Sequence, residues 1–178
     1  MKTIVAYSIS LLFGVAVYLF WAIPFRGALN YHEEFQLFLN DADYFLAHLS
    51  QPGGLSVYLS EFLVQFYNNY WIGALILAIE FMLIQWLTLK VLQGMFRTWS
   101  QKHSYLLCIL SLIPALLLWL VLGDINVMHS LIIAVIVALA LILIIVSVLK
   151  DKIYRIFGTF VSIIIYICVA GATIAFLA

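Results

Sequence analysis

Five long apolar runs constrain the fold of this chain more than any other feature. They cover residues about 3–25, 71–89, 105–122, 127–149 and 156–177. About 20 apolar residues in a helix cross the hydrocarbon core of a bilayer, and a helix satisfies its own backbone hydrogen bonds there. Only 9% of the 178 residues are charged, against about 25% in soluble domains. The sequence predicts an all-α integral membrane protein, with five transmembrane helices in a single membrane domain, residues 1–178.

The distribution of lysine and arginine predicts the orientation of these helices. Seven of the eight cations lie before the first run, between the second and third, or between the fourth and fifth, and only Arg26 lies on the opposite side. Cytoplasmic loops of membrane proteins are enriched in such residues. We therefore expect a cytoplasmic amino terminus and a carboxyl terminus outside. The net charge is zero, so no basic surface favours nucleic acid as a partner.

The connection between the first two runs, residues 26–70, is too polar to cross a membrane and too apolar for an ordinary loop. Tyr31–Leu49 gathers its aromatic and leucine side chains on one face of a helical wheel, with carboxylates on the other. Pro52 and the glycines that follow it break this pattern, and Leu55–Tyr67 resumes it. We predict two amphipathic helices in this first outer loop, lying in the membrane interface.

Two adjacent carboxylates, Glu33 and Glu34, lie shortly after the first run. At the depth of lipid phosphates, either could accept a proton from an acceptor hydroxyl during group transfer, and His32 could share that work. The alternative is that these side chains only keep one face of the helix solvated. No cofactor is predicted, although His48 could also share the proton transfer, and a divalent cation bound by His32 or His48 with Glu33, Asp41 or Asp43 stays an alternative.

Three further polar residues are candidates. Arg26 either binds a phosphate in bidentate fashion or anchors the helix end at the interface. Glu80 lies well inside the second run, where a carboxylate is costly and often functional, or is neutral and structural. His129, near the outer end of the fourth run, either approaches the outer segment or caps a helix. Because Glu80 is essentially alone within the predicted spans, an ion- or proton-coupled carrier is disfavoured.

The order of these features resembles the amino-terminal module of GT-C-type membrane glycosyltransferases. The shared order is a first span, an acidic pair directly beyond it, and an outer connection of two interfacial helices, all within about residues 1–90. The resemblance implies a polyprenyl-linked sugar as substrate and Glu33 or Glu34 as the catalytic base. Arg26, His32 and His129 are then the candidate substrate-binding residues.

A second resemblance is carried by Asp43–Leu46, Ser50–Leu55 and Ser60–Tyr67. These segments are similar to a family of multispan bacterial inner-membrane proteins without assigned activity, whose members are generally longer. The chain is then a truncated or split member, a partner subunit, or a relative that keeps the scaffold without the glycosyltransferase activity. The alternative function is a non-enzymatic scaffold or assembly partner whose interfacial hairpin docks another membrane subunit. In every case the lipid bilayer is an expected partner.

Overall fold

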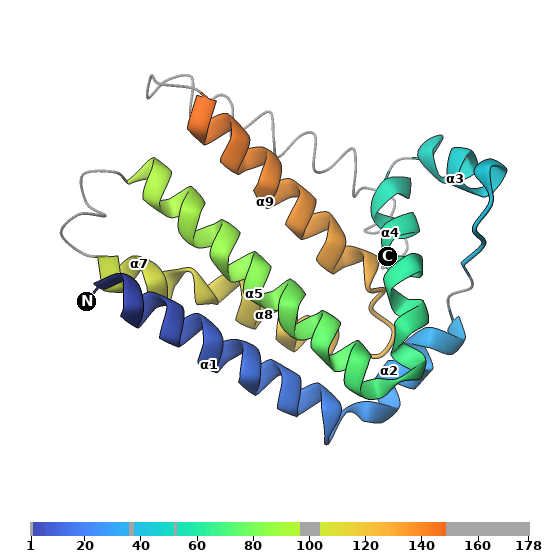
Figure 1. Cartoon of the computed structure of the whole chain (residues 1–178). Helices are drawn as coiled ribbons and strands as arrows, with labels where there is room; N and C mark the ends of the chain where they lie inside the picture. The colour runs from blue at the N-terminus through green and yellow to red at the C-terminus, as the bar shows by residue number, and fades with distance from the viewer. Residues whose placement is uncertain (1, 36–37, 52, 97–103, 149–178) are drawn as a thin grey trace.

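The computed structural model describes residues 2–35, 38–51, 53–96 and 104–148, and these are helical without any strand (Figure 1). The elements are α1 (Lys2–Ala22), α2 (Arg26–Phe35), α3 (Ala42–Leu49), α4 (Gly54–Val64), the 3-10 helix η1 (Gln65–Asn68), α5 (Tyr70–Met95), α7 (Ser104–Leu110), α8 (Leu112–Leu122) and α9 (Ser130–Val148). The predicted all-α class is confirmed for this part of the chain. The predicted fifth span, 156–177, lies outside the described residues.

Three described helical stretches are long and apolar enough to cross a membrane. They are Tyr70–Met95, Ser104–Leu122 and Ser130–Ser147, close to the second, third and fourth predicted runs. A fourth crossing results if α1 and α2, which meet at a bend of 72°, count together. At 21 residues, α1 is itself as long as a transmembrane helix. Length and composition therefore fit a membrane protein with several helices.

Helix α5 is the centre of the bundle. It packs against α1, α9, α8 and α7, and α1, α5 and α9 run side by side (Figure 1). Asn69 caps its first turn, because the side-chain Oδ1 accepts a hydrogen bond from the Trp71 N–H. Gly14 of α1 lies directly against Met82 of α5, and such small residues let helices approach closely in membranes.

The third predicted run corresponds to one apolar stretch, Ser104–Leu122, whose helix has a local break. Helix α7 ends at Leu110 and α8 begins at Leu112. Pro114 has no N–H to donate to the Leu110 carbonyl, and its ring crowds that carbonyl, which explains the break one turn earlier. The Ser111 hydroxyl at the break donates to the Cys108 carbonyl at 2.7 Å, so this buried hydroxyl is satisfied.

The outer connection differs from its prediction in one respect. A single helix over Tyr31–Leu49 is wrong, because α2 begins earlier, at Arg26, and ends at Phe35, while α3 begins at Ala42. Residues 38–41 are not helical, and Asp41 is extended, with φ −133° and ψ 146°. Asn and Asp favour positions just before a helix rather than its interior. A new helix therefore begins after Asn40-Asp41, within the segment that the helical wheel predicted as one continuous helix.

The turn between α3 and α4 is confirmed, and glycine explains its geometry. Gly53 has φ 79°, a left-handed conformation that glycine adopts without a steric cost. A Cβ on Gly54 would lie on the carbonyl of His48, so α3 and α4 come together only with glycine there. The predicted second outer helix, Leu55–Tyr67, corresponds to α4 followed by η1.

Helix α4 presents its small polar side to the protein. Ser56, Ser60 and Val64 are buried, whereas Leu59 and Phe62 are exposed. Helix α4 packs against α9 and stands across the start of α9 in Figure 1. Small residues toward a neighbouring helix and large apolar residues away from it are typical where the surrounding solvent is lipid. The outer segment is therefore part of the bundle and does more than lie on an interface.

Candidate functional site

A chain of three hydrogen-bonded side chains is buried where η1, α5 and the start of α9 meet. The Tyr67 hydroxyl lies 3.0 Å from His129 Nδ1, and His129 Nε2 lies 3.0 Å from Glu80 Oε1. The three residues are 1%, 1% and 5% exposed. The structure thus joins two residues singled out in the sequence, Glu80 and His129, through direct contact. It adds Tyr67, which the sequence analysis did not select.

Local backbone structure holds each member of this chain in place. Gly73 leaves room for the Tyr67 ring, since a Cβ there would lie 3.0 Å from Tyr67 Cδ1. The Tyr67 ring meets the His129 ring edge to face, with centroids 5.5 Å apart. His129 immediately precedes α9, and its carbonyl accepts the Ile132 N–H at 3.0 Å. The three hydrogen-bonded side chains therefore come from a helix start, a 3-10 turn and a helix interior.

The geometry allows two proton arrangements. In one, the Tyr67 hydroxyl donates to Nδ1 and His129 Nε2–H donates to the Glu80 carboxylate. In the other, His129 Nδ1–H donates to the Tyr67 oxygen, and a single proton lies between Nε2 and Oε1. A phenol hydroxyl can donate or accept, and an imidazole carries one or two protons. Both contacts therefore survive the gain or loss of one proton.

His32 of α2 is a second buried histidine near this chain. It is 6% exposed, and its Nε2 has no hydrogen-bond partner within the described residues. Burial, followed by the charge of His129, lowers the pKa of His32 to about 4. Helix α2, which carries His32, packs against η1 and α5, the elements that carry Tyr67 and Glu80. The predicted substrate-binding pair His32 and His129 is therefore brought into one region of the structure.

The other predicted site residues lie elsewhere. Glu34 and Arg26 are exposed, and Glu33 is half-buried on α2. Among the described residues, ion pairs form only between His48 and Glu61 and between His129 and Glu80. The structure therefore does not join Arg26, Glu33 or Glu34 to the buried chain.

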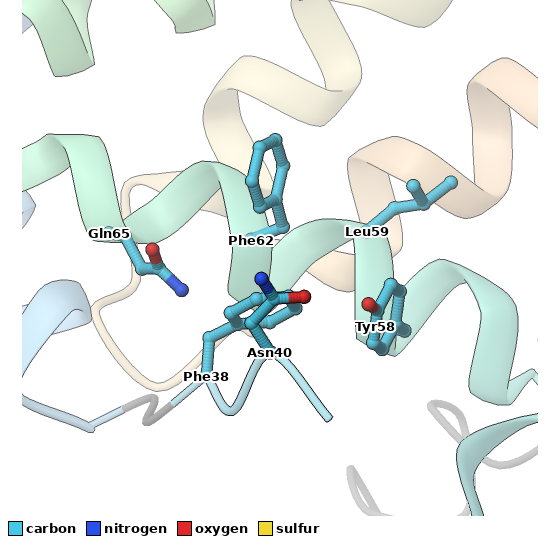
Figure 2. A pocket seen from close by; sticks show the side chains of 6 residues that line it. All are labelled: Phe38, Asn40, Tyr58, Leu59, Phe62 and Gln65. Atoms are coloured by element: carbon cyan, nitrogen blue, oxygen red, sulfur yellow. The ribbon is translucent and has the colours of Figure 1, made fainter. Parts of the chain in front are cut away.

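An open groove of about 500 Å³ lies on the outer segment. It is lined by Phe38, Asn40, Tyr58, Leu59, Phe62 and Gln65. Figure 2 shows side chains of the stretch before α3 facing those of α4 and η1. Phe38 contacts both Tyr58 and Phe62, with ring centroids 5.0 and 5.5 Å apart. The groove thus combines an aromatic wall with two side-chain amides.

A polar contact beside this groove ties α3 to α4. The Tyr44 hydroxyl donates to Glu61 Oε2 at 2.5 Å, and His48 Nε2 lies 3.4 Å from the same oxygen. His48 Nδ1 is 2.9 Å from the Tyr44 carbonyl oxygen, so this nitrogen carries a proton and donates. Burial raises the pKa of Tyr44 to about 12, together with the hydrogen bond to Glu61 and its charge. No three metal-ligating side chains gather within the part of the chain that the structure describes.

The sequence matches a family model along its full length, residues 1–178, and the model is described as a family of unknown function, DUF6057. The chain belongs to the DUF6057 family. No curated protein matches it, and no solved structure does. The multispan family without assigned activity that the sequence predicted is consistent with this membership.

Two features of this DUF6057 chain had weak sequence signals. Tyr67 appeared only as the last residue of an amphipathic pattern, and nothing linked it to His129, 62 positions later. Asn40 lies within the continuous helix predicted over Tyr31–Leu49, whereas the break before α3 brings it to the groove. The Asn40-Asp41 pair, a helix-start signal, was the only local indication of that break.

Proposed function

We propose that this DUF6057 chain handles a lipid-linked sugar at the outer leaflet of a bacterial inner membrane, in the manner of a GT-C-like module. The groove on the outer segment is the observation that supports this function most. Ligand sites are mostly apolar hollows with a few well-placed polar groups. Aromatic rings cover the apolar faces of a sugar ring, and the amides of Asn40 and Gln65 can hydrogen-bond its hydroxyls.

The exposed side of α4 supports a lipid-linked ligand over a free sugar. Leu59 and Phe62 line the groove and are 37% and 43% exposed. Leu39, next to the groove residue Phe38, is 51% exposed. An isoprenoid chain can therefore continue along apolar surface while the sugar stays at the amides. The amino terminus is then cytoplasmic and the groove lies outside, as the cation distribution predicts.

In this proposal a carboxylate of α2 is the base. Glu33 is half-buried whereas Glu34 is exposed, so Glu33 is better sheltered from water. The acceptor hydroxyl gives its proton to this carboxylate while its oxygen forms a bond to the anomeric carbon. The bond between that carbon and the phosphate oxygen breaks, and the polyprenyl phosphate leaves with the electron pair. Arg26, exposed at the start of α2, would contact the phosphate.

A binding experiment with matched variants tests the groove. The full chain in lipid nanodiscs is titrated with a short-chain polyprenyl-phosphate hexose. Phe62 and Phe66 are equally exposed at 43%, but only Phe62 lines the groove. We expect Phe62→Ala to weaken binding about tenfold, the effect of losing part of a buried aromatic side chain, and Phe66→Ala to leave it unchanged. No saturable binding, or equal loss in both variants, would refute a sugar site in the groove.

The base is tested separately from the groove. Glu33→Gln and Glu34→Gln are compared for lipid-linked sugar products in cells that lose these products when the gene is deleted. Loss of product with Glu33→Gln, while hexose binding is retained, is the expected result. Normal products in the double variant would exclude both carboxylates as bases. A cysteine at Asn40 that reacts only after permeabilisation would overturn the orientation.

The alternative is a scaffold whose outer helices dock another membrane protein. It is supported by the same exposed apolar side of α4 and η1, including Leu55 of α4 at 40% and Phe66 of η1 at 43%. In that case the lipid-linked hexose does not bind. Phe62→Ala and Phe66→Ala then both reduce the amount of a defined subunit that co-purifies with the chain.

A further inference from the structure

The buried chain of Tyr67, His129 and Glu80 has no part in the proposed sugar site. Glu80 lies in the interior of α5, which is long and apolar enough to cross a membrane. A carboxylate at such depth is costly unless its charge is compensated. Among the described residues no lysine or arginine pairs with it, and His129 is its only ion-pair partner. A proton shared with His129 can supply the compensating charge.

Counting protons distinguishes the possible states. With an ionised Glu80 and a neutral His129, the buried group carries one net negative charge. One added proton gives either an imidazolium beside a carboxylate or a neutral imidazole beside a carboxylic acid, and both are net neutral. The proton enters at His129, and the Tyr67 hydroxyl hydrogen turns away from Nδ1, so that its oxygen accepts instead. Neither of the hydrogen bonds that join Tyr67, His129 and Glu80 is lost. The low-dielectric surroundings favour the state in which this buried group has no net charge.

We propose that Glu80 and His129 form a buried proton-binding site, with Tyr67 as the hydroxyl that keeps the site hydrogen-bonded in both proton states. Its ligand is a single proton. The second oxygen of Glu80 is buried and lacks a partner within the described residues. A buried oxygen without a partner makes an ionised carboxylate costly, whereas most buried polar atoms in proteins are hydrogen-bonded. The free oxygen instead suits a group whose charge changes.

The surroundings limit the site to one proton. Among the described residues, His32 of α2 is a titratable side chain that interacts electrostatically with His129, and this interaction disfavours charge on both rings. Tyr67 faces it from η1 and stays a neutral phenol, because burial and then the charge of Glu80 raise its pKa well above 10. Release of the proton leaves a buried negative charge, so it requires a movement that admits water or a cation to Glu80. The site therefore suits coupling of a proton to a conformational change.

This inference changes one expectation from the sequence. A proton-coupled carrier was disfavoured because Glu80 appeared to be alone within the spans. The structure places His129 against it, 49 positions away, and supplies the second titratable group that proton coupling needs. That particular argument against proton coupling therefore fails.

Nitrogen NMR and infrared spectroscopy of the full chain in nanodiscs test the proposal. Histidine labelled with ¹⁵N shows whether His129 carries one or two protons, and the carboxyl stretch shows whether Glu80 is protonated. At neutral pH we expect one proton, detected at either group in the wild type. In Glu80→Gln the carboxyl signal of this site is absent and His129 becomes neutral. Glu61→Gln, which removes the carboxylate that pairs with His48, is the matched control and should leave His129 unchanged.

Two outcomes would overturn the proton site. One is a wild type in which His129 is neutral while Glu80 is ionised, a result that needs no variant. The other is a wild type with a doubly protonated His129 that stays doubly protonated in Glu80→Gln. Tyr67→Phe gives a second readout, because it keeps the ring and removes only the hydroxyl. We expect hydrogen exchange at His129 Nδ1 to be at least tenfold faster in this variant, and an unchanged rate would exclude the assigned role of Tyr67.

Discussion

The Tyr67→Phe substitution gives the clearest stability test of the buried chain. The ring is 1% exposed, and its contacts with Gly73 and His129 are kept in phenylalanine. Only the hydroxyl bond to His129 Nδ1, 3.0 Å long, is lost. A buried group left without its partner costs about 1–3 kcal/mol. Hydrogen bonds between membrane helices average about 0.6 and reach about 1.7 kcal/mol, because the unfolded chain also finds partners.

We therefore expect Tyr67→Phe to lower the free energy of unfolding by about 1–2 kcal/mol, a factor of roughly 5–30 in the ratio of folded to unfolded protein. Reversible unfolding in mixed micelles measures this difference. Tyr58→Phe is the control, since Tyr58 is half-buried and less dependent on one interior bond. A double-mutant cycle of Tyr67→Phe and Glu80→Gln should give a coupling of at least about 0.5 kcal/mol in the free energy of unfolding. The hydrogen-bonded connection from Tyr67 through His129 to Glu80 would be refuted if Tyr67→Phe lowered the free energy of unfolding no more than Tyr58→Phe does and if its effect were additive with that of Glu80→Gln.

Three other predictions address the outer segment. Between pH 6.5 and about 4, His32 binds a proton in the unfolded protein but not in the folded protein. The free energy of unfolding should therefore fall by up to about 3 kcal/mol as the pH drops through this window. His32→Gln should remove this part of the pH dependence of unfolding, and an unchanged pH dependence would contradict the prediction. Gly54→Ala should destabilise the turn between α3 and α4 by about 1–3 kcal/mol, because the new Cβ meets backbone, whereas Gly27→Ala has open space and should be neutral or stabilising in the same unfolding assay. Glu61→Gln should bring the pKa of Tyr44 down from about 12 toward 10, measured by phenolate absorbance against a Tyr44→Phe background, and a pKa that stays near 12 would mean that burial alone raises it.

Local patterns predicted the helices well where one physical rule dominated. The apolar runs located α5, α8 and α9, because a lipid-exposed helix needs continuous apolar sequence. They located the stretch Ser104–Leu122 but not its local break at Ser111, and they failed at residues 38–41, where Asn40-Asp41 ends a pattern that looked continuous. In both cases one or two residues with particular backbone preferences outweighed the periodicity of the longer segment.

The candidate sites were only partly visible in the sequence. Glu80 and His129 were each noted for their polarity in apolar surroundings, yet their partnership depends on how α9 packs against α5. The groove depends on residues from both sides of the turn at Gly53, brought together by the packing of α3 on α4. The proposed base residues, Glu33 and Glu34, were read from their position after α1, and their role stays a prediction.

The sequence by itself determined the class of this protein, a helical chain with several apolar segments fit for a membrane, because hydrophobicity and helix length are local properties. It also determined that residues 26–70 differ from a simple loop. Only the tertiary structure decided that the small polar side of α4 faces α9 and that a tyrosine, a histidine and a glutamate far apart in the chain form one buried site. The physical reason is that a buried polar group must be satisfied by whichever residue packing brings within about 3 Å.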